Sequence, residues 1–96
     1  MFKRPYKVGY TADGNEAEIA EALEADGWEV WQIGWPLDLL VRRDGVIGVI
    51  EVKNPNGKHE KLGTLRPVQE RFILGGGNTG VVFDTDMALA LAATFK

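Results

Sequence analysis

Two carboxylates and one lysine lie within or directly after two apolar runs of this 96-residue sequence. Glu51 and Lys53 follow the apolar run 46–50, and Asp38 interrupts another apolar run thirteen residues upstream. Carboxylate oxygens are the hard ligands that Mg²⁺ prefers, and a bound divalent ion neutralises phosphate charge and lowers the pKa of a bound water. An ammonium beside them could orient that water or stabilise a pentavalent transition state. These residue types predict metal-dependent attack of water on a phosphate.

The spacing of Glu51 and Lys53 matters because residues 46–53 are predicted to form a buried strand. The run is apolar and rich in β-branched residues, and turn-forming residues bound it at 44–45 and at 54–57. Alternate side chains of a strand share one face, so Glu51 and Lys53 point the same way. The Val52 carbonyl between them is a further candidate metal ligand.

Each of these residues also has an ordinary structural interpretation. Glu51 and Lys53 could be a cross-strand surface pair, because Glu-x-Lys occurs by chance in most proteins. Asp38 could lie at a strand edge or pair with Arg42 or Arg43. An unpaired buried charge is costly and buried acids are rarely without a role, so the sequence favours a functional interpretation of Asp38.

A helix is predicted over residues 13–25, ahead of these strands. Asp13 and Glu16 have the spacing of a capping box, and Gly27 is the kind of residue that ends a helix. Glu16 shares the inward, apolar face of the helix. Capping is the common role for an acid at this position and is the favoured interpretation. The alternative is a third carboxylate that reaches the metal or its waters.

The remaining pattern completes one mixed α/β domain over residues 1–96. Strands are predicted at 28–33, 37–43 and 46–53, with a hairpin turn at 44–45, and together they form a meander. A polar loop at 54–64 leads to a helix at 68–74 with Val68 and Phe72 inward. A strand at 79–84 and a helix at 87–94, capped by Asp86, close the chain. The predicted order is αβββαβα, a mixed sheet flanked by helices.

The composition is that of an ordinary folded protein, with 45% hydrophobic and 26% charged residues. The absence of cysteine excludes disulfides and thiolate metal sites, and it fits a reducing compartment. No segment approaches the roughly 20 apolar residues of a membrane span, and the start lacks the apolar core of a signal peptide. The sequence therefore predicts a cytoplasmic protein without a membrane partner.

The formal net charge is −3, but the charges are unevenly distributed. Residues 13–29 carry only acids, whereas bases dominate residues 53–71. A local basic surface beside the candidate site suits a phosphate backbone, and the alternative is a pair of solvated faces. The predicted phosphate contacts are Lys58, Lys61, Arg66 and Arg71. The tryptophans Trp28, Trp31 and Trp35 are interpreted as core and sheet packing, with base stacking as the alternative.

These motifs together resemble the PD-(D/E)xK nuclease superfamily, and within it the stand-alone VRR-Nuc domains found largely in phages and prophages. The resemblance covers about residues 13–92 and rests on the helix opening 13–16, the segment 36–41, Glu51-Val52-Lys53 and the segment 65–70. It implies a restriction-endonuclease-like fold and a DNA phosphodiesterase dependent on Mg²⁺, with Mn²⁺ able to substitute. Two positions depart from the pattern: Leu37 separates the proline from the aspartate, and Arg66 stands where a threonine cap is usual.

The resemblance also implies roles for individual residues. Asp38 and Glu51 would hold the metal, Lys53 would be the catalytic lysine, and Gln69 would be the helix residue that supports it. Glu16 matches an acid that some resolvase-like relatives carry on their first helix. The implied substrates are branched DNAs, including Holliday junctions and flaps, and the implied setting is a phage or its bacterial host cell.

Three functions remain open on the sequence. The favoured one is a structure-specific endonuclease acting as a homodimer, because a four-way junction needs two symmetric cuts. A non-catalytic DNA- or protein-binding module on the same fold is the alternative, although a degenerate relative usually loses the glutamate or the lysine. A sequence-specific restriction-type enzyme is disfavoured, because no recognition domain fits in 96 residues.

Overall fold

A computed structural model describes residues 15–54 and 65–96 of the chain. The expectations for the first twelve residues and for almost all of the polar loop therefore lie outside the described residues. The helices and strands follow the predicted order αβββαβα. They are α1 (Glu16–Ala25), β1 (Glu29–Gln32), β2 (Leu39–Arg43), β3 (Val46–Val52), α2 (Pro67–Leu74), β4 (Thr79–Val82) and α3 (Thr85–Ala92).

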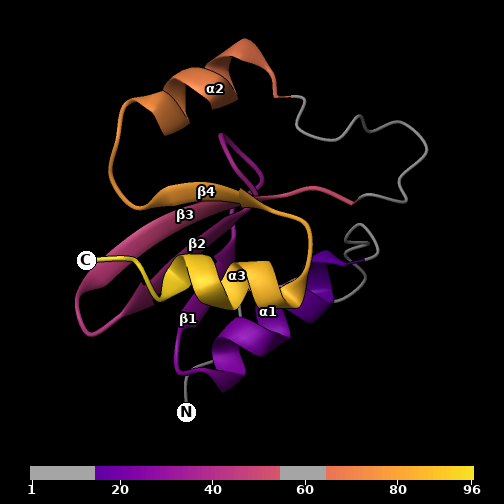
Figure 1. Cartoon of the computed structure of the whole chain (residues 1–96), viewed down its shortest axis with the longest axis vertical. Helices are drawn as coiled ribbons and strands as arrows, with labels where there is room; N and C mark the ends of the chain where they lie inside the picture. The colour runs from indigo at the N-terminus through magenta and orange to yellow at the C-terminus, as the bar shows by residue number, and fades with distance from the viewer. Residues whose placement is uncertain (1–14, 55–64) are drawn as a thin grey trace.

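The sheet has the strand order β1-β2-β3-β4 (Figure 1). β1, β2 and β3 are antiparallel neighbours, which confirms the predicted meander, and β4 lies parallel to β3. The turn between β2 and β3 places Asp44 and Gly45 at φ values of 52° and 81°. Both are left-handed backbone conformations that Asp and Gly tolerate better than other residues, so this dipeptide sets the hairpin.

The core lies between the sheet and the two helices α1 and α3, which sit side by side along one of its faces (Figure 1). The inward positions of the strands alternate with outward ones, as the two-residue period of a strand requires. The buried apolar cluster is formed by Ile19, Ala20, Leu23, Trp28, Val30, Leu39, Val41, Ile50, Val52, Val82, Ala88 and Ala92. The mixed α/β fold that the sequence predicts is therefore confirmed.

The second helix, α2, lies apart from α1 and α3, beyond the end of the sheet (Figure 1). Val68 and Phe72 are 44% and 39% exposed, so the prediction that they point inward is wrong. The buried side chain of this helix is Gln69. The apolar spacing at 68 and 72 does not mark a core-facing side here, because the helix does not lie on the sheet and the described residues leave both side chains partly uncovered.

Some helix ends agree with the predictions and others differ: α3 covers Thr85–Ala92 and not 87–94, and the N-cap of α1 is Asn15 and not Asp13. Gly27 follows the end of α1 at a φ of 101°, and Trp28 N–H bonds back to the Leu23 carbonyl at 3.0 Å, so the predicted glycine stop is confirmed. The cap of α3 is Asp84, whose Oδ1 accepts from Met87 N at 2.8 Å. The assignment of that cap to Asp86 was wrong, because the helix begins at Thr85 and Asp86 already lies in its first turn.

Among the described residues, no helix has the length and apolar character needed to cross a bilayer. Of the tryptophans, Trp28 is buried in the core, as predicted, whereas Trp35 is 51% exposed in the loop between β1 and β2. The predicted packing role therefore does not describe Trp35, about half of whose surface is exposed.

Candidate active site

The end of the β2–β3 ladder brings Asp38 close to Glu51. The regular pairing of the two strands ends with Leu39 facing Ile50, and Asp38 directly precedes β2. Asp38 N–H donates to the Ile50 carbonyl at 3.1 Å, and Asp38 Oδ2 accepts from Val52 N–H at 2.8 Å. The side chain thus takes a backbone donor of β3 just before β2 begins. The negative charge of Asp38 acts on Glu51, and two carboxylates this close are destabilising unless something compensates them.

The alternative in which Asp38 pairs with a neighbouring arginine does not describe this structure. Arg42 Nε lies 2.7 Å from Glu29 Oε1, and Arg43 Nη1 lies 3.2 Å from Asp26 Oδ2. Arg43 also donates to the Asp26 carbonyl at 2.8 Å. Both arginines therefore pair with acids at the other end of the sheet from Asp38.

Glu51 and Lys53 form a close and largely buried pair. Lys53 Nζ lies 3.5 Å from Glu51 Oε2, and the two side chains are 14% and 6% exposed. This burial excludes the ordinary surface pair that the Glu-x-Lys spacing alone would allow. The other oxygen of the same carboxylate, Glu51 Oε1, is buried and has no hydrogen-bond partner among the described residues. Buried acceptors without a hydrogen-bond partner are uncommon in folded proteins, so this oxygen is a candidate atom for binding a ligand.

The environment raises the pKa of Glu51 to about 7. Burial is the largest cause, and the negative charge of Asp38 adds to it, while Lys53 acts in the opposite direction. The carboxyl therefore exchanges a proton close to neutral pH. Perturbed acids of this kind cluster at functional sites, because the same burial and like-charge neighbours that shift a pKa also bind cations.

These residues fit a divalent cation. Two neighbouring carboxylates, one with an oxygen that has no partner among the described residues, are hard ligands, and a positive charge would relieve the repulsion between them. Within residues 15–54 and 65–96, no three or more His, Cys, Asp or Glu residues gather closely enough to hold a metal together. Asp38 and Glu51 are the candidate donors that the sequence predicts, and two carboxylates suit an ion such as Mg²⁺ that keeps several of its waters. The Val52 carbonyl as a ligand stays a prediction.

Glu16 is buried at the start of α1, and Gln32 Nε2 donates to its Oε2 at 3.0 Å. The residue at the N-cap position of this helix is Asn15. Glu16 therefore has a hydrogen-bonded place between α1 and β1, and its role as a metal ligand stays a prediction. Asp13, the other half of the proposed capping box, lies outside the described residues.

Asn15 is a residue of this region that the sequence did not single out. Its side-chain Nδ2 donates to the carbonyls of Lys53 at 3.1 Å and Phe83 at 2.8 Å. These bonds fix the start of α1 to the ends of β3 and β4, and hence hold the backbone that carries Lys53. An asparagine just before a helical pattern is a signal for a cap, but only the fold shows that it bridges two strands instead.

Gln69 ties α2 to the loop that precedes Asp38. Its Nε2 donates to the Pro36 carbonyl at 3.1 Å, and its Oε1 accepts from Arg66 N–H at 3.0 Å. The second bond is one half of a capping box, made although arginine stands at the N-cap. Gln69 thus positions α2 against the segment leading to Asp38, and its predicted support of Lys53 stays a prediction.

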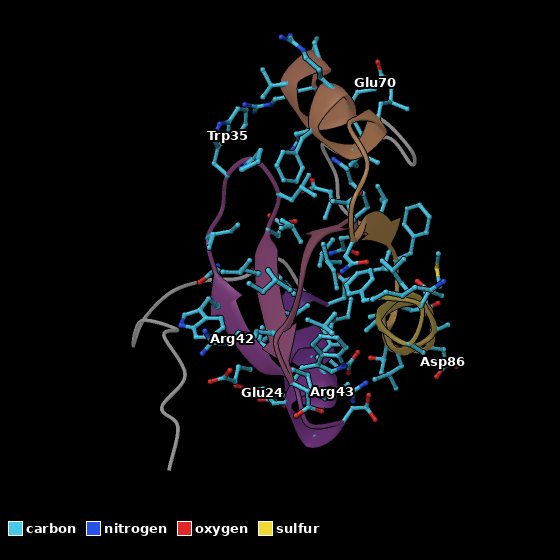
Figure 2. The ribbon with its side chains drawn as sticks, turned by 90° about the vertical axis from the view of Figure 1, so that its left-hand side faces the viewer. Glu24, Trp35, Arg42, Arg43, Glu70 and Asp86 are labelled. Atoms are coloured by element: carbon cyan, nitrogen blue, oxygen red, sulfur yellow. The ribbon has the colours of Figure 1, made fainter. Side chains whose placement is uncertain are left out.

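The basic residues are only partly described. Arg66, at the N-cap of α2, and Arg71, on α2, are exposed, while Lys58 and Lys61 lie outside the described residues. Figure 2 shows Trp35 in the loop beside α2, on the opposite side of that helix from Glu70. The Arg66 guanidinium carbon lies 6.0 Å from the centre of the Trp35 ring. An exposed aromatic and cationic surface therefore adjoins the loop that carries Asp38.

Comparison with known proteins gives one curated relative. The chain is 33% identical over an aligned length of 97 to a UPF0102 protein of Granulibacter bethesdensis, an alignment that covers 79% of this chain and 61% of that protein. The chain thus spans less than two thirds of the length of this relative, and the match does not support the VRR-Nuc type. No protein-family profile matches the chain, and no solved structure matches it.

Proposed function

We propose that this protein is a Mg²⁺-dependent endodeoxyribonuclease, with Mn²⁺ able to take the place of Mg²⁺. The observation that carries the proposal is the closeness of Asp38 to Glu51, together with Lys53 Nζ 3.5 Å from Glu51 Oε2. The unpartnered Glu51 Oε1 and the raised pKa of that carboxyl are consistent with a cation site. The similarity to a nuclease-related family supports the same class of activity.

Each residue has a distinct part in this proposal. Asp38 and Glu51 hold the ion, which when bound neutralises phosphate charge and lowers the pKa of a water. Lys53 places its ammonium beside the same phosphate, where it stabilises the charge that develops as the water attacks. Asp38 also accepts from Val52 N–H, so its carboxylate is fixed in orientation before any ligand arrives.

The substrate that we propose is branched or otherwise structured DNA, such as a Holliday junction or a flap. Arg66 and Arg71 on α2, together with Lys58 and Lys61, would contact its phosphates. Each phosphate contact that is removed should lower the salt dependence of binding by about one unit of slope. If the salt dependence of binding is unchanged in a variant with all four residues neutralised, these residues do not contact the phosphates.

We further propose that the active form is a homodimer, because a four-way junction requires two symmetric cuts. Sedimentation at working concentrations should give twice the mass of the chain. A monomeric mass under conditions of full activity would exclude this part of the proposal. The stand-alone VRR-Nuc type and a phage or bacterial cytoplasmic setting complete the proposed assignment.

The test is cleavage of a labelled four-way junction, a flap and a plain duplex, each with Mg²⁺, with Mn²⁺ and with a chelator. Wild type and Lys53→Ala are compared, with Arg42→Ala as a control that breaks an exposed ion pair of the same sheet. We expect metal-dependent cutting of the branched substrates, lost in Lys53→Ala and retained in Arg42→Ala. Binding of the junction by folded wild-type protein without any cutting would instead establish a non-catalytic binding module.

A further inference from the structure

An exposed aromatic pocket lies between α2 and the loop that joins β1 to β2. Its volume is about 330 Å³, and it is lined by Trp35, Pro36, Val68, Arg71 and Phe72. This volume is at the small end of the range for ligand pockets, which is roughly 300–1,000 Å³. Trp35 is 51% exposed and Phe72 is 39% exposed, so large ring surfaces face solvent where the described residues provide no cover.

The pocket is joined structurally to the candidate active site. Pro36, which lines it, stands two residues before Asp38 in the same loop. Gln69 is buried between the two parts and donates to the Pro36 carbonyl at 3.1 Å. A ligand held by α2 and this loop would therefore lie next to the strand ends that carry the neighbouring carboxylates.

The charge around the pocket is positive although the whole chain has a net charge of −3. Arg71 lines the pocket, and the Arg66 guanidinium lies over the Trp35 ring at 6.0 Å. Neither arginine pairs with an acid of residues 15–54 or 65–96. Glu70, between them in sequence, lies on the other side of α2 from Trp35 (Figure 2). The pocket therefore offers aromatic rings together with cations whose charge is not neutralised by the described side chains.

Another tryptophan–arginine pair, which lies on β1 and β2, shows the difference. Arg42 lies over the Trp31 ring at 5.0 Å, and these residues line a pocket of about 300 Å³ on the strands. There Glu29 accepts from Arg42 at 2.7 Å, so the positive charge is neutralised. Both pockets thus have an aromatic surface and an arginine. The arginine charge is neutralised by an acid in the pocket of Trp31 and is not neutralised by a described acid in the pocket of Trp35. Of the two, the pocket of Trp35 is the one that suits an anionic aromatic ligand.

We propose that the pocket of Trp35 and Phe72 receives an unpaired nucleobase of the DNA substrate, while Arg66 and Arg71 hold the adjoining phosphates. The inference rests on the proposed nuclease function and deepens it. A base within a duplex is already stacked on its neighbours and does not reach this pocket, whereas a flap or an opened junction arm presents one. Stacking on an aromatic ring accepts any base, because each has a π-face. The pocket thereby makes the enzyme select DNA with unpaired nucleotides close to the cut.

The experiment is a binding measurement in chelator, where no cleavage takes place. The probes are a labelled duplex with a single-stranded thymidine tail, the same duplex with an abasic tail of equal length and charge, and the blunt duplex. Wild type should bind the thymidine tail roughly tenfold more tightly than the abasic tail, which corresponds to one stacked base. Trp35→Ala should bind both tailed duplexes equally, and Trp35→Phe should recover part of the preference.

Trp31→Ala is the matched control, because it removes another ring that carries an arginine and lines a pocket. It should keep the preference for the thymidine tail. Loss of the preference in both alanine variants, or in neither, would overturn the proposal. Phe72→Ala, on a separate element, should reduce the preference as well, so the test does not depend on the folding of one variant. Far-ultraviolet circular dichroism and urea unfolding check that each variant is folded.

Failure of this inference can be told apart from failure of the proposed function. Wild type that cuts branched DNA but binds thymidine and abasic tails equally would remove the base pocket and leave the nuclease. Wild type that prefers the thymidine tail through Trp35 but never cuts would remove the nuclease and leave the base pocket.

Discussion

The sheet carries two acid–base pairs, one at each end, whose residue types are alike and whose behaviour differs. At one end Glu29 and Arg42 meet at 2.7 Å with side chains 33% and 47% exposed. At the other end Glu51 and Lys53 meet at 3.5 Å with side chains 6% and 14% exposed. The hydrogen bond from Arg42 lowers the pKa of Glu29, whereas burial raises the pKa of Glu51 to about 7.

The difference shows which properties distinguish a candidate cation site from an ordinary surface ion pair. In an exposed pair, both charges are solvated and neutralise each other, so the pair needs no further ligand. The buried pair has a second acid beside it, because the negative charge of Asp38 acts on Glu51 and raises its pKa. One oxygen of Glu51 remains without a hydrogen-bond partner among the described residues. These two properties distinguish the buried pair from the exposed one, and they are the reason that we propose a divalent ion there.

The largest effect is expected when Asp38, the second acid, is changed. Asp38→Asn keeps an oxygen that can accept from Val52 N–H but removes a charge from the proposed cation site. Cleavage of a labelled junction should fall by more than roughly 100-fold, since even indirect supports of a metal site are worth 10- to 100-fold. Asp26→Asn, which alters the exposed pair with Arg43, should cut at the wild-type rate. An equal loss of cleavage in both variants would show that Asp38 has no special part in the reaction.

Glu51→Gln should raise the stability of the metal-free protein at pH 7.5. A pKa raised from 4.5 to about 7 means that the folded state holds a proton that the unfolded state has released. Stability of the wild type therefore falls as pH rises from about 4.5 to about 7, and the full loss is roughly 2–4 kcal/mol. Urea unfolding across pH 4–8 measures it, and the glutamine variant should lack this slope.

Glu29→Gln is the matched control for that experiment, and its effect should have the opposite sign. The pKa of Glu29 is lowered, so ionised Glu29 stabilises the folded state above the pKa of the unfolded chain. Its replacement should slightly lower stability at neutral pH. A wild-type stability that rises steadily from pH 4.5 to 7 would show that Glu51 is not a proton acceptor of the kind described.

Mg²⁺ should stabilise the protein more at pH 8 than at pH 6. At pH 6 the ion must displace the proton of Glu51, because that pH is below the pKa of about 7. At pH 8 and ten times the dissociation constant, the gain is about 1.4 kcal/mol and appears as a higher melting temperature. Glu29→Gln should keep this shift and Glu51→Gln should lose it. A shift that does not change with pH would place the ion elsewhere.

The smallest effect concerns the link between α2 and the site. Gln69→Ala removes the bonds to the Pro36 carbonyl and to Arg66 N–H and should cost about 1–2 kcal/mol in urea unfolding. Glu70→Ala, its exposed neighbour, should leave the unfolding midpoint in place. If the two variants unfold alike, α2 is held by other contacts and the loop before Asp38 is positioned without it.

Much of the fold was accessible from the sequence, because local patterns set it. Asp44-Gly45 predicted the hairpin, and that hairpin fixes the register of β2 on β3, whose last pair, Leu39 and Ile50, lies next to Asp38 and Glu51. The alternation of Ile50, Glu51 and Val52 gave the two faces of β3. These features depend on neighbours along the chain, which a sequence displays.

What the sequence did not give depends on where distant elements lie. Val68 and Phe72 have the spacing of a buried stripe, but α2 is displaced from the sheet, and periodicity does not report such a displacement. The sequence did not single out Asn15, whose amide reaches the carbonyls of Lys53 and Phe83, because no local pattern reports a contact with two distant strands. The exposure of Trp35 likewise follows from the path of the loop and not from its residue type.

The alternation along β3 also bears on how faithfully the chain finds its fold. Ile50 and Val52 lie in the apolar core, while Glu51 between them lies on the other face. A slip of one residue in the pairing of β3 would drive the carboxylate under α1 and α3 and take the two apolar side chains out of the core. That misaligned sheet would be heavily penalised, so it is excluded as a competing product of folding. The acid that makes the native protein less stable near neutral pH thus also marks the correct alignment of its central strand.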